Sequence, residues 1–164
     1  IKTIDSANQI EANLRVVLVG DTLAKFTEQE AHRDYFVHMK RLFNAIASDI
    51  ADEVGATAIL TGENLGQVSS QTLGNLGAVE EASRFRILRP LLGLDKQEII
   101  DQARVLGTYE ISTGPELCDA LGPQRPTTVA DLNRLRENEK NQGGLEKLAK
   151  SCLNSLRTRP LNSE

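Results

Sequence analysis

Residues 35–60 read YFVHMKRLFNAIASDIADEVGATAIL, a helix-like stretch followed at once by a strand-like one. Gly55 is expected to end the helix, because glycine readily adopts the left-handed conformation of a helix C-cap. The short apolar run at 56–60 then predicts a buried strand. The helix itself is predicted from apolar residues that recur at helical spacing: Phe36, Met39, Leu42, Phe43, Ile46, Ile50 and Val54.

The same alternation of strand and helix extends to both sides of this junction. Residues 15–21 (RVVLVGD) and 86–92 (RILRPLL) are further predicted strands, and helices are expected around 69–76 and 95–106. Asp95 is the expected cap of the latter helix. This order is typical of a doubly wound α/β domain with a mostly parallel, Rossmann-like sheet. In such domains ligands bind beyond the carboxyl ends of the strands.

A change in composition after residue 107 defines the domain organisation. Glycines and prolines cluster at 108–128, which predicts a loop or lid, and Thr127 or Thr128 is the expected start of a charged helix. We therefore expect one partial α/β domain at residues 1–128 and a C-terminal helical extension at 129–164. Within the extension we expect two helices and a frayed tail, at 129–140, 145–156 and 157–164.

Composition excludes several classes of protein. The formal net charge of −4 argues against a strongly basic nucleic-acid binder. Two cysteines are too few for a secreted disulfide framework, which favours the cytoplasm. No apolar run approaches the roughly 20 residues that span a bilayer, so no membrane association is expected. His32 and His38 have no partner at metal-ligand spacing, so we predict no metal site on the protein.

The densest cluster of polar residues is TGENLGQVSSQ at 61–71. Gly62 directly follows a predicted strand, where a ligand could approach the backbone closely. The next helix would offer free N–H groups to a phosphate or oxyanion. Gln67, Ser69, Ser70 and Gln71 could read a base through hydrogen bonds. The alternative is an ordinary loop between strand and helix with a serine N-cap, which composition alone favours.

The two cysteines differ in context. Cys118 lies in GPELCD, a glycine- and proline-containing loop in which a thiol is accessible, although Glu116 and Asp119 disfavour the thiolate. The alternative for Cys118 is a buried, inert thiol. Cys152 lies on the apolar face of a predicted helix and is expected to be core. Several cations could hold phosphates, with solvated surface positions as the alternative: Lys40, Arg41, Arg84, Arg86 and Arg89.

Three segments carry a family resemblance. These are TGENLGQVSSQTL at 61–73, ILRPLLGLDKQEII at 87–100 and LGTYEIS at 106–112. Together they closely resemble the catalytic domain of the tRNA 4-thiouridine synthases, also known as thiamine-biosynthesis sulfurtransferases. The resemblance runs nearly without gaps from about Val16 to Cys118. The family belongs to the PP-loop ATP pyrophosphatases, whose fold is a doubly wound α/β domain.

The resemblance implies a reaction. The family uses ATP, expected to arrive with Mg²⁺, to adenylate a uridine carbonyl oxygen in tRNA; pyrophosphate leaves, and persulfide sulfur then displaces AMP. Nucleotide contacts fall on Gly62, Gln71 and Lys40, where many relatives have arginine, and the sulfur-handling cysteine falls on Cys118. The implied partners are tRNA and a cysteine desulfurase or other persulfide donor. A homodimer and a role in thiamine synthesis are also open.

The phosphate loop of the family, Ser-Gly-Gly-x-Asp-Ser, is not found in this sequence. We therefore expect the chain to be an incomplete representation of the enzyme and inactive alone. Two alternatives stay open. One is a different PP-loop enzyme that amidates or ligates, which would need no sulfur-handling cysteine at position 118. The other is a non-catalytic remnant that acts as a binding or dimerisation module.

Overall fold

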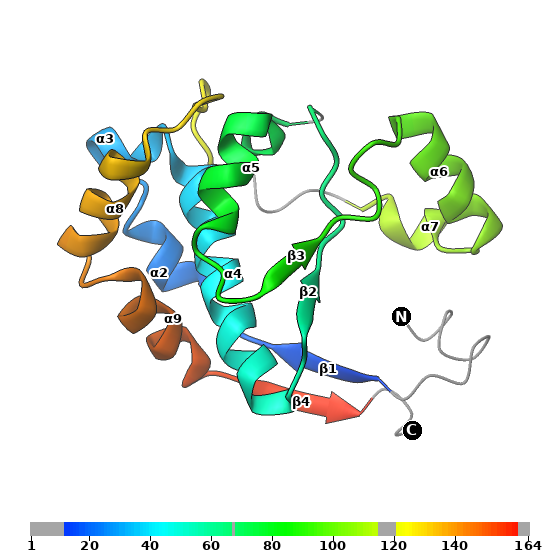
Figure 1. Cartoon of the computed structure of the whole chain (residues 1–164), viewed down its shortest axis with the longest axis horizontal. Helices are drawn as coiled ribbons and strands as arrows, with labels where there is room; N and C mark the ends of the chain where they lie inside the picture. The colour runs from blue at the N-terminus through cyan, green and yellow to red at the C-terminus, as the bar shows by residue number, and fades with distance from the viewer. Residues whose placement is uncertain (1–11, 67, 115–120, 161–164) are drawn as a thin grey trace.

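The long helix α4 (Tyr35–Val54) supplies much of the buried core, and α6 and α7 lie away from it (Figure 1). The computed structural model describes residues 12–66, 68–114 and 121–160. As expected, α4 ends at Gly55, whose backbone is left-handed with φ of +66°. Not all apolar residues of this helix lie in the core, since Phe43 and Val54 are 41% and 54% exposed.

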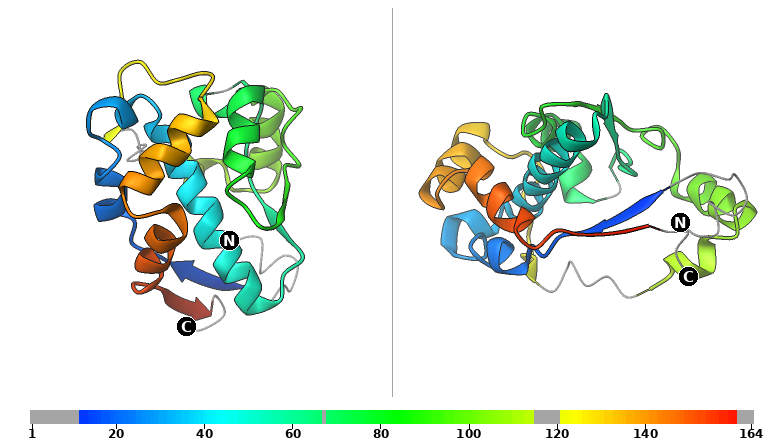
Figure 2. Two further views of the ribbon diagram at one scale, coloured as in Figure 1. Left: turned by 60° about the vertical axis from the view of Figure 1, so that its left-hand side comes forward. Right: turned by 90° about the horizontal axis from the view of Figure 1, so that it is seen from below.

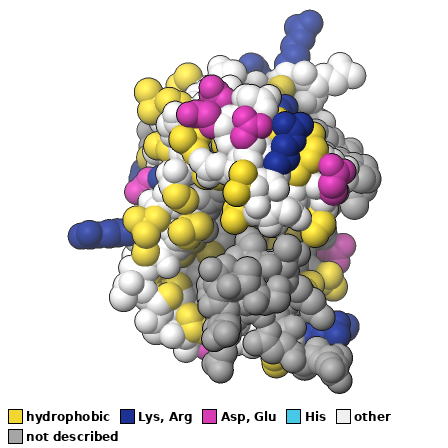
Figure 3. Space-filling view, turned by 90° about the vertical axis from the view of Figure 1, so that its right-hand side faces the viewer, with side chains coloured by type: hydrophobic (Ala, Val, Ile, Leu, Met, Phe, Trp, Pro, Cys, Tyr) yellow, Lys and Arg dark blue, Asp and Glu magenta, His cyan; other side chains and the backbone are white. Residues whose placement is uncertain are grey.

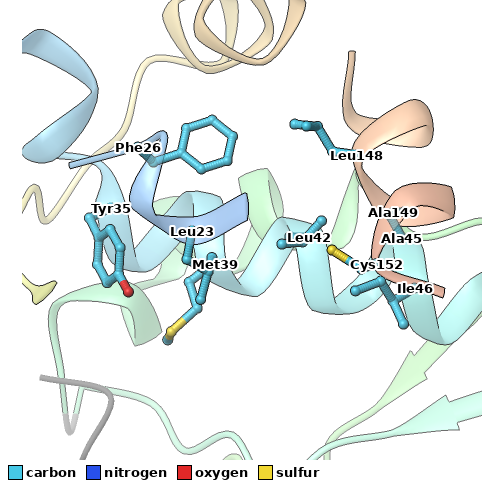
Figure 4. Close-up of a cluster of buried hydrophobic side chains, with 10 residues drawn as sticks. All are labelled: Leu23, Phe26, Tyr35, Met39, Leu42, Ala45, Ile46, Leu148, Ala149 and Cys152. Atoms are coloured by element: carbon cyan, nitrogen blue, oxygen red, sulfur yellow. The ribbon is translucent and has the colours of Figure 1, made fainter. Parts of the chain in front are cut away.

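One face of α4 forms the main core with α2 (Gly20–Ala24) and α9 (Leu145–Leu153). Figure 4 shows these side chains gathered between the helices. Cys152 belongs to this core, with its Sγ 3.2 Å from Thr22 Oγ1, which confirms that it is a buried thiol. The buried members of the cluster are Leu23, Phe26, Tyr35, Met39, Leu42, Ala45, Ile46, Leu148, Ala149 and Cys152.

The strands form two pairs. β2 (Ala58–Leu60) and β3 (Arg86–Leu88) are parallel, with Ile59 opposite Ile87. β1 (Asn13–Val16) and β4 (Arg157–Pro160) are antiparallel and lie side by side in both panels of Figure 2. The order β1, α4, β2, α5, β3, α6 confirms the predicted α/β alternation. Within the described residues the two pairs are separate sheets, and the parallel pairing is confined to β2 and β3.

The helices that follow the parallel strands have well-defined starts. The 3₁₀ helix η1 (Ser69–Gln71) leads into α5 (Leu73–Glu80), whose N-cap is Thr72 rather than a serine. α6 (Lys96–Val105) begins at Asp95 as expected: the Asp95 carboxylate accepts from Glu98 N, and the Glu98 carboxylate accepts from Asp95 N. The short α7 (Tyr109–Ser112) completes this part.

Several predicted boundaries are wrong. The short helix α3 (Gln29–His32), before α4, was not among the predicted elements. β1 ends at Val16, and Gly20 already begins α2, so the predicted strand at 15–21 is largely not strand. α8 (Leu132–Asn141) begins after Asp131, whose carboxylate accepts from Asn133 N and Arg134 N and so caps the helix in place of Thr127 or Thr128. The tail expected to fray includes β4, which β1 stabilises by backbone pairing.

A buried ion network joins α4, α5 and α8. Arg41 is almost fully buried; it donates to Glu139 at 2.6 Å and 3.0 Å, to Glu81 at 2.7 Å and to the Ala78 carbonyl at 2.5 Å. His38, stacked on Phe26, lies 3.4 Å from the Glu139 carboxylate. Arg41 is therefore neither a phosphate ligand nor a solvated surface charge, because its guanidinium is committed to packing these helices together.

The surface on the side of α6 and α7 carries scattered hydrophobic side chains among charged ones (Figure 3). Val105 and Ile111, on these two helices, are strongly exposed. Leu60 and Leu88, which are opposite each other on β2 and β3, are also exposed. None of the helices in the described ranges has both the length and the apolar character required to cross a membrane.

Candidate functional site

A cavity of about 870 Å³ lies beside α4, with three walls of different origin. The first comes from α4, the second from the segment around η1, and the third from residues 122–126. Most of the lining is apolar or aromatic, which is typical of small-molecule sites. The lining residues are Phe36, Met39, Lys40, Phe43, Val68, Ser69, Ser70, Gln71, Gly122, Pro123, Gln124 and Pro126.

Lys40 and Gln71 supply specific polar groups to this cavity. Among the described residues, none donates a hydrogen bond to Oε1 of the Gln71 amide, although this oxygen is buried. A buried acceptor left without a donor is costly, so a bound molecule with an N–H group would relieve that cost. Lys40 adds a cation from α4. Lys40 and Gln71 therefore add a cationic and an amide side chain to a lining that is mostly apolar.

Lys40 is paired with the carboxylate of Glu63, which was not among the predicted site residues. Glu63 is only 3% exposed, and its carboxylate is 3.3 Å from Lys40 Nζ and 2.8 Å from Arg89 Nε. Thr61 Oγ1 also donates to it at 3.2 Å. Burial alone would raise the pKa of Glu63, but the hydrogen bond from Arg89 and the charges of Lys40 and Arg89 outweigh burial and hold the pKa below its ordinary value. Glu63 is therefore an anion that both cations share.

Asn75, on α5, fixes two walls of the cavity relative to each other. Its fully buried amide donates to the carbonyls of Ser69 at 2.7 Å and Thr127 at 3.0 Å, and accepts from Ala130 N at 2.8 Å. Thr72 Oγ1 adds a bond of 2.5 Å to the Thr128 carbonyl. These bonds join the segment around η1 to the chain that continues from the third wall.

The third wall is also attached to the chain near the start of α4. The carbonyl of Leu121 lies 3.0 Å from His32 Nε2, and Thr127 N donates to the Arg33 carbonyl at 2.9 Å. Between these anchors Gly122 lies directly against the Phe36 ring. A Cβ at this glycine would be 2.9 Å from Phe36 Cε2 and closer still to Cζ. Glycine is therefore required here for the wall to approach the ring.

Some of the residues predicted for the site line the cavity, and others do not. Lys40 and Gln71 line the same cavity, although 31 positions separate them along the chain. Gly62 does not line the cavity; it is exposed next to Glu63, with open space where a Cβ would lie. Cys118 lies outside the described residues. Of the other predicted base-reading residues, Ser69 and Ser70 line the cavity and Gln67 lies outside the described residues.

Sequence reasoning missed Glu63, Asn75 and Phe36 as parts of the site. Glu63 was within the quoted polar cluster, and its position directly after Gly62 at the end of a strand was the available signal. Asn75 is a buried amide in a short helix, a position that asparagine rarely occupies without hydrogen-bond partners. Phe36 was named only as part of the apolar repeat that predicts the helix, and only the folded chain shows that it lines a cavity.

Two of the other predicted cations, Arg84 and Arg89, are engaged in ion pairs. Arg84 binds the carboxylates of Asp49 and Asp52. Arg89 binds Glu63 and Glu80. Over the described ranges, no cluster of three or more His, Cys, Asp or Glu side chains could hold a metal ion.

Comparisons with known proteins agree on one family. The model of the family described as thiamine biosynthesis protein (ThiI) matches residues 2–143. A tRNA sulfurtransferase of Psychromonas ingrahamii is 44% identical over 118 residues, which cover 71% of this chain and 24% of that protein. A probable tRNA sulfurtransferase of Moorella thermoacetica is 40% identical over 147 residues, which cover 87% of this chain and 37% of that protein.

A solved structure is similar over nearly the entire chain. It is a crystal structure of a 4-thiouridine synthetase–RNA complex with bound ATP, with a TM-score of 0.87 and 31% sequence identity. The similarity covers 97% of this chain and 42% of that one. This match supports the doubly wound α/β fold class, and the chain spans less than half the length of each of these three proteins.

Proposed function

This chain belongs to the thiamine biosynthesis protein (ThiI) family, and we propose that it forms the nucleotide-binding part of an ATP-dependent tRNA sulfurtransferase. The observation that carries the proposal is the cavity that both Lys40 and Gln71 line, together with the buried Gln71 Oε1, which has no donor among the described residues. A structural neighbour with bound ATP supports a nucleotide as the ligand, since 97% of this chain matches it.

The chemistry of the cavity fits an adenine nucleotide. The flat ring surfaces of Phe36 and Phe43 and the prolines of the third wall suit a purine. Adenine carries an exocyclic amine, a donor that would satisfy Gln71 Oε1. The ammonium of Lys40 would attract a phosphate. Gly62, at the end of β2, is proposed as a further nucleotide contact, because its open side leaves room for a ligand to approach.

Any Mg²⁺ would come with the phosphates of the nucleotide. None of the residues that line the cavity in the described ranges is a carboxylate, and no metal cluster was found there. Mg²⁺ commonly keeps several water ligands and binds through substrate phosphates with few protein groups. We therefore propose ATP as the cofactor and assign no protein ligand to the metal.

Cys118 is proposed as the thiol that handles sulfur. Leu121, three positions later, is held by His32, and the next residue, Gly122, lines the cavity. Because an extended chain spans at most about 3.6 Å per residue, the peptide chain limits Cys118 to roughly 11 Å from Leu121. A thiol within that range could deliver sulfur to a uridine whose carbonyl oxygen has been adenylated. The sulfur would come from a persulfide donor such as a cysteine desulfurase.

The matched relatives favour sulfur transfer over the other candidates. Both sequence relatives are named as tRNA sulfurtransferases, and the structural neighbour is a 4-thiouridine synthetase in complex with RNA. An amidating or ligating enzyme would need no thiol at position 118. We propose tRNA as the substrate, in the cytoplasm. As a second role we propose a supply of sulfur for thiamine synthesis, in line with the description of the family.

The test is ATP binding by the 164-residue chain, measured by calorimetry. Lys40→Ala and Gln71→Ala should each weaken ATP binding about tenfold or more, because each removes a charged or buried hydrogen-bonding group. Lys147→Ala, on the exposed side of α9, is the matched control and should leave affinity unchanged. Equal affinity in all four proteins would place the nucleotide elsewhere.

A further inference from the structure

Glu63 connects two elements through its cations. Lys40 comes from α4, whereas Arg89 directly follows β3, and the Glu63 carboxylate lies between them at 3.3 Å and 2.8 Å. Its side chain is 4% exposed, so water competes little for these contacts. Glu63 does not itself line the cavity, but Lys40 does. Any effect of Glu63 on a ligand in the cavity must therefore act through its neighbours.

The Lys40 ammonium needs such a neighbour to have a defined position. Lysine carries its charge on a flexible four-carbon stem, which samples many rotamers unless a partner fixes it. Within the described part of the chain, Glu63 is the one carboxylate in an ion pair with Lys40. An ammonium has three N–H donors, so one bond to Glu63 leaves two for a ligand.

We propose that Glu63 is a positioning residue that holds the Lys40 ammonium in place for a nucleotide phosphate. This role rests on the proposed nucleotide site. A lysine that is already ordered loses less conformational entropy when the phosphate binds. By ordering Lys40, the buried carboxylate would therefore contribute to ligand binding as well as to packing. The role concerns the phosphate alone and predicts no effect on the base.

The negative charge of Glu63 and its anchoring of Lys40 would have opposite effects on phosphate binding. As a nearby negative charge, the carboxylate repels a phosphate, so its removal would strengthen phosphate binding. As an anchor for Lys40, it promotes phosphate binding, so its loss would weaken it. Glu63→Asp keeps the charge and withdraws the carboxylate by one methylene, whereas Glu63→Gln keeps the length and removes the charge. The two variants together separate the two effects.

The experiment compares AMP with adenosine, which differ only in the phosphate, by calorimetry on the 164-residue chain. Glu63→Asp should weaken AMP binding about tenfold and leave adenosine binding unchanged. Glu63→Gln should also weaken AMP binding. Glu80→Gln is the matched control, because Glu80 binds Arg89 at 2.7 Å, is half exposed, and makes no ion pair with Lys40. It should change neither affinity.

A double variant tests whether Glu63 acts through Lys40. In a Lys40→Ala background, Glu63→Asp should cause no further loss of AMP affinity. Stronger AMP binding by Glu63→Gln, or equal losses for AMP and adenosine, would overturn the positioning role. AMP binding that neither Glu63 variant alters would also overturn it while leaving the nucleotide site intact. Absence of AMP and adenosine binding by the unmodified chain would overturn the proposed site and this role together.

Discussion

Gly122 and Phe36 define how closely the third wall of the cavity approaches α4. The glycine has no side chain, and the Phe36 ring occupies the place where a Cβ would be. The wall cannot retreat freely, because Leu121 and Thr127 are anchored on either side by His32 and the Arg33 carbonyl. A substitution at this one position should therefore change both stability and the cavity.

Gly122→Ala should lower the free energy of unfolding by about 1–3 kcal/mol, the usual cost of forcing extra atoms into a packed site. Phe36→Leu in the same chain should recover part of that loss, because the smaller side chain leaves room for the new methyl group. Urea denaturation of the two single variants and the double variant measures this coupling. Gly93→Ala is the control, since a Cβ there meets no atom within 4 Å. Additive losses would show that the two residues do not compete for space.

The outcome at single residues shows what sequence can and cannot predict. The role of Asp95 as a helix cap and the burial of Cys152 were predictable, because each follows from the residue pattern of a single helix. Lys40 and Gln71 were selected by family resemblance, and the fold brings both to one cavity. Glu63 was missed because its role depends on two ion-pair partners, Lys40 and Arg89. They lie 23 positions before it and 26 after it, so only folding brings them together.

At the scale of elements, α4 has two separate functions. One face packs against α9 in the core, and the other presents Phe36, Lys40 and Phe43 to the cavity. Helical periodicity identified the helix correctly, and the glycine at position 55 identified its end. The periodicity could not separate a core-facing phenylalanine from one that lines a cavity, because both follow the same spacing. The boundaries of β1 and α8 were also predicted wrongly. The extent of β1 depends on its pairing with β4, and the start of α8 depends on the cap that Asp131 forms.

The attachment of α8 to α4 depends on Glu139. Burial alone would raise the pKa of this carboxyl group, but hydrogen bonds with His38 and Arg41 outweigh burial and hold the pKa below its value of 4.5 in an unfolded chain. A carboxylate with a lowered pKa in the folded state stabilises the fold fully above the unfolded value. That contribution is lost as the pH falls through the folded pKa.

Glu139→Gln should therefore lower the free energy of unfolding by about 3 kcal/mol at neutral pH, because it leaves Arg41 without its main buried counter-charge. The difference from the unmodified chain should shrink as the pH falls below the unfolded-state value of 4.5 and through the lower folded-state pKa. Urea unfolding at a series of pH values measures both effects. Glu137→Gln, exposed on the same helix, is the control and should change little. A deficit that stays constant with pH would contradict the assigned charge of Glu139.

At the scale of the whole molecule, the C-terminal part shares the core of the α/β part. α9 packs on α4, and β4 pairs with β1. We propose that residues 129–164 are a helical extension that follows the α/β domain in sequence. This extension contributes buried residues to the common core. The predicted alternation of strands and helices was right, but their arrangement in two pairs was not predictable, because strand pairing is set by contacts distant in sequence.

The most direct test of the nucleotide site is to map its position by NMR. AMP is titrated into the isotope-labelled 164-residue chain, and shifts of the backbone amide signals are followed. We predict that the largest shifts occur at Ser70, Gln71 and Gly122, which line the large cavity. A smaller cavity of about 400 Å³ lies between Gly66 and Leu94, and serves as the internal comparison. Shifts centred on Gly66 and Leu94, with Gln71 and Gly122 unaffected, would contradict the account.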